Sequence, residues 1–129
     1  MAAVAISTFD PFDLPEWLGT EQVTWQTDGP LSEEPRVAGW LCAAPAHSRQ
    51  LDLLAVDAAY PDPVCPSAQR HDAHQAWHFG QVLLLELDGR VVAAVPGVRF
   101  DANLAIEAIR RVAKAIGAST ANFSVTLTL

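Results

Sequence analysis

Three histidines form the densest group of side chains in this sequence that could carry chemistry. His71, His74 and His78 lie within eight consecutive residues, HDAHQAWH. On a helix, residues spaced by three and seven positions lie within about 60° of one another on the same face. A row of imidazoles of this kind could bind zinc, nickel or copper. A further ligand could come from one of three other residues: Cys65, Asp62 or His47.

A second interpretation of the histidines competes with metal binding. Ala73, Ala76 and Trp77 mark an apolar side of the same segment, roughly opposite the histidines. The imidazoles are then expected to face water, where few groups are available to orient them as ligands. Their spacing also matches no named zinc motif. We therefore favour an ordinary polar helix face with no resident cofactor, and keep metal binding as the alternative.

Cys65 is the candidate nucleophile. It stands two residues before Ser67, a suitable N-cap, so helix amides and the helix dipole could favour its thiolate. His71 or His74 could then act as the base. We favour a small apolar side chain in the proline-rich connection 60–66. A histidine-based metal or small-ligand protein, including an enzyme that uses Cys65, is the alternative function.

The charge balance opposes two classes of partner. The formal net charge of −7 leaves only eight lysines and arginines, whereas nucleic acids and anionic membranes require clustered cations. Arg110, Arg111 and Lys114 do cluster, but Glu107 lies one turn earlier on the same segment. This pattern favours a solvated, salt-bridged helix face. We expect no nucleic-acid partner.

Length and composition indicate one folded unit. The 129 residues are 50% hydrophobic and 18% charged, which predicts a single domain over residues 1–129 with a true core. The first ten residues carry no basic region, and their apolar run is too short for a signal peptide or a membrane span. These features predict a cytoplasmic location and no membrane partner.

The segment Gln81–Phe100 is expected to organise the domain. Two apolar runs flank Asp88-Gly89, a strong signal for a two-residue β-hairpin loop. Leu87 then faces Arg90, and Leu83 faces Ala94. Beyond the tip both faces are apolar, as in strands that are covered on both sides.

The remaining elements follow from periodicity and from stop signals. Strands are predicted at about Gln22–Thr27, Val37–Ala44 and Gln50–Asp57, and an edge strand at Asn122–Leu129. Helices are predicted from Ser67 to about Phe79 and over Ala102–Ile116. The expected fold is α+β: an antiparallel sheet of about six strands, in the order βββ-α-ββ-α-β, with two helices packed on it and an N-terminal proline and aromatic arm at 1–19.

The arm supplies the candidate interface. Its apolar residues are too frequent for a free tail, and they are Phe9, Phe12, Leu14, Trp17 and Leu18. Two helices are expected to leave one face of the hairpin bare, and this arm and a second copy of the chain are expected to close it. The predicted function is that of a small accessory or protein-binding domain, a homodimer, larger homo-oligomer or subunit, without catalysis.

Overall fold

The structure is a computed structural model, and it describes residues 6–8, 22–31, 35–43, 47–57 and 67–128. It contains eight strands and two helices. The strands before the first helix are β1 (Ile6–Thr8), β2 (Gln22–Pro30), β3 (Arg36–Val37), β4 (Gly39–Ala43) and β5 (His47–Ala55). The later elements are α1 (Ser67–His78), β6 (Leu83–Leu87), β7 (Arg90–Val95), α2 (Ala102–Ala115) and β8 (Ser119–Thr128).

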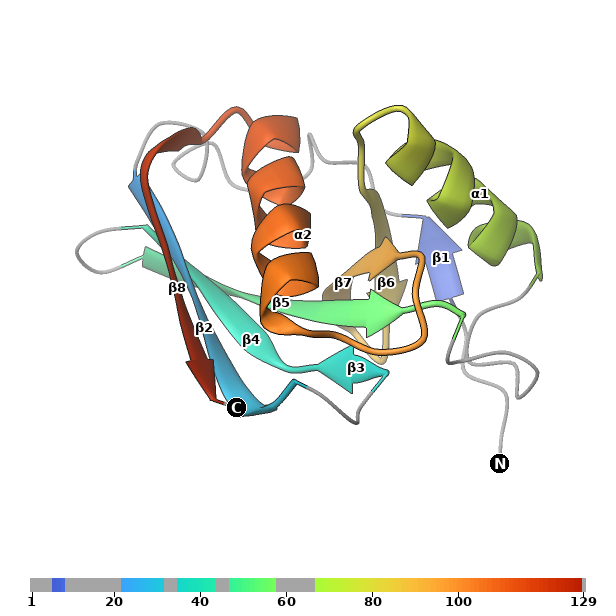
Figure 1. The fold of residues 1–129 in the computed structure, drawn as a ribbon, viewed down its shortest axis with the longest axis horizontal. Helices are drawn as coiled ribbons and strands as arrows, with labels where there is room; N and C mark the ends of the chain where they lie inside the picture. The colour runs from blue at the N-terminus through green and yellow to red at the C-terminus, as the bar shows by residue number, and fades with distance from the viewer. Residues whose placement is uncertain (1–5, 9–21, 32–34, 44–46, 58–66, 129) are drawn as a thin grey trace.

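All eight strands belong to one mixed sheet. Seven of them follow in the order β1-β6-β7-β5-β4-β2-β8, and β3 pairs with β5. The strand β5 changes its neighbours along its length, because its first half pairs with β4 and its second half with β3 and β7. Figure 1 shows β8 and β2 at one side of the molecule, with α1 and β1 at the other.

The expected antiparallel sheet of about six strands is wrong, because two of its pairings are parallel. The meander of β2, β4 and β5 is antiparallel, as predicted. However, β5 pairs in parallel with β7, and β2 pairs in parallel with β8. The two hairpin strands run in opposite directions, so docking β6 against β5 would have given an antiparallel contact. The apolar pattern of the sequence does not indicate which of the two hairpin strands lies beside β5. The strands β1 and β3 also add to the predicted number.

The central hairpin is confirmed residue by residue. Leu87 pairs with Arg90, Glu86 with Val91, and the register continues to Leu83 and Ala94. The loop residues Asp88 and Gly89 have φ angles of 55° and 73°. Positive values at both central positions define the type I′ turn, whose twist matches that of the flanking strands.

The two faces of the hairpin pack into different cores. The face toward α2 joins the larger core through Val82, Leu84, Val91, Ala93 and Val95. The other face joins a smaller core that includes Ala73 of α1, and its hairpin members are Leu83, Leu85, Leu87, Val92 and Ala94. Leu85, Leu87, Val92 and Ala94 have no exposed area within the single chain. The expectation of a bare face that needs a second copy is therefore wrong.

Both helices begin and end close to where local signals place them. Asp101 caps α2, and its side chain accepts a hydrogen bond from the Leu104 amide at 2.7 Å. Gly117 follows the helix with a φ of 76°, a left-handed conformation that glycine adopts without strain. In the part of the chain that the structure covers, neither helix has the length and apolar character needed to cross a membrane.

Candidate functional site

The three histidines lie on α1 with exposed side chains. His71, His74 and His78 are all exposed, whereas Ala73 is buried and Trp77 is partly buried against the larger core. The helix therefore has the polar and apolar sides that the sequence predicts. No group of three or more histidine, cysteine or acidic side chains with metal-binding geometry occurs among the described residues.

Within the described part of the chain, His74 has a polar partner that the sequence did not predict. His74 Nε2 lies 2.8 Å from Asp57 Oδ1, at the end of β5. Arg70 Nε donates to the same oxygen at 2.9 Å, and the backbone N–H of Gly97 donates to Asp57 Oδ2 at 3.1 Å. Asp57 thus joins α1, the end of β5 and the segment after β7, which makes the cluster a connection between elements.

Two opposing effects set the pKa of Asp57. Partial burial raises the pKa, but hydrogen bonds from His74 and Arg70, together with their charges, lower it by more. The net result is a pKa below the ordinary value, so the carboxylate stays ionised and available to its partners at neutral pH.

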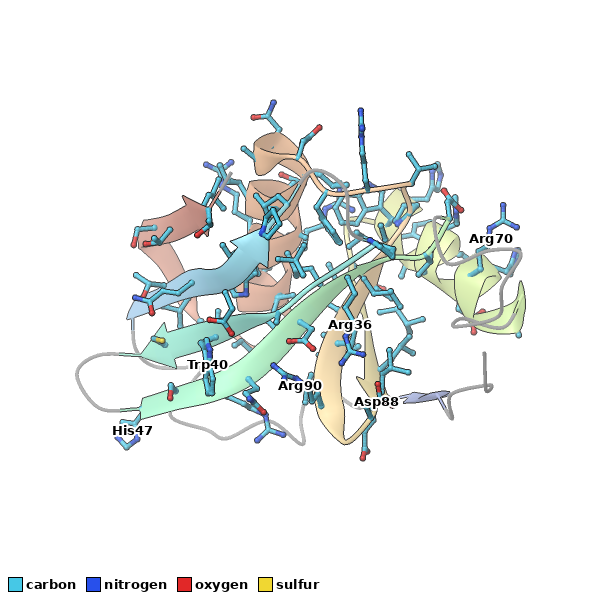
Figure 2. The ribbon with its side chains drawn as sticks, turned by 90° about the horizontal axis from the view of Figure 1, so that it is seen from below. Arg36, Trp40, His47, Arg70, Asp88 and Arg90 are labelled. Carbon is cyan, nitrogen blue, oxygen red and sulfur yellow. The ribbon has the colours of Figure 1, made fainter. Side chains whose placement is uncertain are left out.

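A second ionic cluster, which sequence reasoning missed, surrounds Asp52. Its side chain is 1% exposed and accepts hydrogen bonds from two arginines. Arg36 donates to Oδ2 through Nε at 3.1 Å and Nη2 at 2.8 Å, and Arg90 Nη2 donates to Oδ1 at 2.9 Å. Arg36 also reaches Asp88 at the hairpin tip, with 3.0 Å between Nη1 and Oδ2. Figure 2 shows Arg36, Arg90 and Asp88 gathered between β5 and the hairpin.

The Asp52 cluster is balanced in charge. Two arginines face two aspartates, and the carboxylate of Asp52 is enclosed by its donors. It lies just after the point where β5 changes neighbours, and it connects β3, β5 and β7. The sequence signal for it is an aspartate inside the apolar run LDLLAV, since a buried carboxylate requires cationic partners. We interpret the cluster as a structural ionic contact that holds β3, β5 and β7 together where β5 changes its neighbours.

Several predicted positions lie outside the described residues. They include the candidate nucleophile Cys65 and the candidate ligand Asp62. The same is true of the interface candidates Phe9, Phe12, Leu14, Trp17 and Leu18. His47 is described, and Figure 2 places it at the start of β5, far from Arg70 on α1. The structure therefore does not bring His47 to the other histidines.

The outer edge of the sheet is the best candidate for an interaction surface. The strand β8 ends the strand order, and β2 is its one partner among the described strands. Ser124, Thr126 and Thr128 are exposed, whereas Val125 and Leu127 pack against the larger core. Over its ten residues β8 contains no charged residue and no proline. At the opposite edge, β1 has only three residues.

Comparison of the chain with protein-family models, curated proteins and solved structures finds no match. The site must therefore be interpreted from its geometry.

Proposed function

We propose that this chain is a protein-binding or accessory domain that acts as a homo-oligomer without catalysis, and that two copies join by pairing their β8 strands. The observation that supports this is the long, neutral, unpaired edge of β8 in the described sheet. An edge strand presents a row of backbone N–H and C=O groups that can pair with another strand. Proteins usually block such edges with lysine, proline or a very short strand, and β8 has none of these features.

The side chains of β8 suit pairing with an identical strand. A twofold axis perpendicular to the sheet makes the two β8 strands antiparallel and keeps each face on its own side. The row Ser124, Thr126 and Thr128 then lies beside the same row of the second copy. Val125 and Leu127 likewise extend the apolar side next to the core. Each contact in this arrangement joins side chains of the same polarity, as favourable cross-strand pairs do.

Charge also favours the β8 edge as the contact between copies. Two chains of formal net charge −7 repel each other, and like charges directly opposite in a sheet destabilise pairing. Because β8 carries no charge, a second copy can approach along this edge without such a pair. The pairing of β8 with β2 is most regular at Ser124–Thr126, beside Thr24–Gln26, which places a straight segment near the middle of the edge.

Sedimentation velocity across a range of concentrations tests the proposal. The expected result is a monomer–dimer equilibrium. Thr126→Lys puts a charge on the exposed side of β8 and should weaken dimerisation about threefold to fivefold at low salt. Gln26→Lys is the matched control, because Gln26 is exposed and pairs directly with Thr126 but lies on the inner strand β2.

Two outcomes would overturn the proposal. One is a chain that stays monomeric up to the highest usable concentration. The other is equal weakening by Thr126→Lys and Gln26→Lys, which would show that the contact is elsewhere or responds only to net charge.

A further inference from the structure

A pocket between the end of α1 and the second half of α2 combines cations with an aromatic wall. Its volume is about 410 Å³, and it is lined by residues 79–82 on one side and by Arg111, Lys114 and Ala115 on the other. Pockets of this size hold small organic ligands. None of the described residues that line it is acidic.

Arg111 is held in position before any ligand arrives. Its Nε donates to Glu107 Oε1 at 3.0 Å, and its Nη1 donates to the carbonyl oxygen of Trp77 at 2.6 Å. The guanidinium carbon lies 3.6 Å from the centre of the Trp77 ring. Within the described part of the chain, Nη2 has no hydrogen-bond partner. A fixed donor of this kind loses little side-chain entropy when it binds an anion.

Lys114 supplies a second cation on the same side of α2. It lies three residues after Arg111, so the two side chains share one face of the helix. Lys114 is exposed and lines the pocket. The described residues offer it no carboxylate within ion-pair distance, in contrast to Arg111, which pairs with Glu107. Of the two cations in the described lining, Lys114 therefore has no salt bridge to a described residue, and its whole charge is available to a ligand.

Phe79 is the aromatic residue of the described lining. It is 68% exposed, the highest exposure among the large hydrophobic side chains that the structure describes. Its ring lies edge-on to that of His78, with 5.3 Å between ring centres. An aromatic side chain this exposed is available to cover the apolar part of a ligand.

We propose that this pocket binds a small monocarboxylate with an apolar body. Nη2 of Arg111 and the ammonium of Lys114 bind the two carboxylate oxygens, and Phe79 covers the body. The pocket lies beside the last turns of α2, where the helix dipole is negative, so a single negative charge is favoured over the double charge of a phosphate monoester. The proposal is independent of β8 pairing, because none of the described lining residues belongs to β8.

Titration of the full-length, ¹⁵N-labelled chain, followed by amide NMR shifts, tests the proposal. Phenylacetate is the main probe, with phenylacetamide as its neutral analogue, acetate as the anion without a body, and phenyl phosphate as the dianion. Saturable shifts with phenylacetate are expected at residues 79–82 and 111–115. Lys114→Gln should raise the dissociation constant about fivefold, as loss of one charge-assisted hydrogen bond implies.

The matched control is Arg110→Gln. Arg110 is exposed and adjacent in sequence. It lines a neighbouring hollow, which shares Lys114 with this pocket, but it is not among the described residues that line the pocket itself. Its replacement removes the same charge and should leave phenylacetate binding within twofold of the unmodified chain, an allowance of about 0.4 kcal/mol. Phe79→Ala, at an exposed position that the fold does not need, should also weaken binding.

Three results would overturn the proposal. The first is the absence of saturable shifts with phenylacetate. The second is equal weakening by Lys114→Gln and Arg110→Gln. The third is binding of phenyl phosphate, phenylacetamide or acetate as tight as that of phenylacetate, because each would remove the need for a monocarboxylate with an apolar body.

Discussion

His74 Nε2 lies 2.8 Å from Asp57 Oδ1, so a side-chain contact joins α1 to the end of β5 across 17 positions of sequence. Arg70 binds the same carboxylate oxygen. Because β5 lies in the middle of the sheet, this contact fixes α1 to the strands that it covers.

The first prediction concerns acid stability. The pKa of Asp57 lies below its ordinary value of 3.8, because the hydrogen bonds and charges of His74 and Arg70 outweigh the opposing effect of burial. A carboxylate with a lowered pKa in the folded state stabilises the fold above its unfolded pKa, and this contribution is lost as the pH falls through the folded pKa. The free energy of unfolding should therefore differ between the unmodified chain and Asp57→Asn at pH values well above 4, and the difference should shrink below about pH 4.

Urea unfolding between pH 7 and pH 3 measures this difference. Asp72→Asn is the matched control, since Asp72 is an exposed aspartate on α1. A difference between Asp57→Asn and the unmodified chain that stays constant over the whole pH range would contradict the prediction.

The second prediction concerns the ionic cluster at Asp52. Asp52→Asn removes the charge that neutralises Arg36 and Arg90, whose side chains are only 26% and 29% exposed. Loss of one partner from a buried ionic cluster should cost about 2–4 kcal/mol in the free energy of unfolding. Asp88→Asn is the comparison, because Asp88 is 56% exposed, and asparagine also suits its positive φ. Its cost should stay below about 1 kcal/mol. If chemical denaturation shows a similarly small loss of unfolding free energy for both variants, the Asp52 cluster does not stabilise the contacts among β3, β5 and β7.

The third prediction concerns the hairpin turn. Gly89 has a φ of 73°, which a β-branched residue adopts only with strain, so Gly89→Val should cost on the order of 1 kcal/mol or more. Gly29→Val is the control. Gly29 lies in β2 with no positive φ, and an added Cβ would meet nothing within 4 Å. Thermal unfolding should rank Gly89→Val as the less stable variant, and the reverse order would contradict the I′ turn.

The fourth prediction concerns a close approach between β4 and the indole of Trp25. A Cβ added at Gly39 would overlap the Trp25 ring, which is fully buried and donates from Nε1 to the carbonyl oxygen of Leu51 at 3.2 Å. Gly39→Ala should therefore destabilise the fold by about 1–3 kcal/mol through overpacking. Trp25→Leu removes the ring, so the double variant should lose less stability than the sum of the two single variants. Strictly additive losses would show that the two residues do not compete for the same space.

The sequence alone determined the elements whose causes are local. The hairpin register followed from Asp88-Gly89 between two apolar runs, and the bounds of α2 followed from Asp101 and Gly117. The position of β8 at an edge followed from its strict alternation of apolar and polar residues. Each of these signals acts between residues that are close in sequence, so a short window contains the whole cause.

The tertiary structure decided the strand directions and the composition of the clusters around Asp52 and Asp57. The strands β6 and β7 are both apolar on two faces, so pattern alone could not show that β7, and not β6, lies beside β5 and makes that pairing parallel. In the same way, Asp52 meets Arg36 and Arg90 from positions 16 and 38 residues away. Arg111 meets the backbone of Trp77 from 34 residues away. Contacts over such separations form only when the whole chain is packed. No short segment of the sequence therefore contains enough information to predict them.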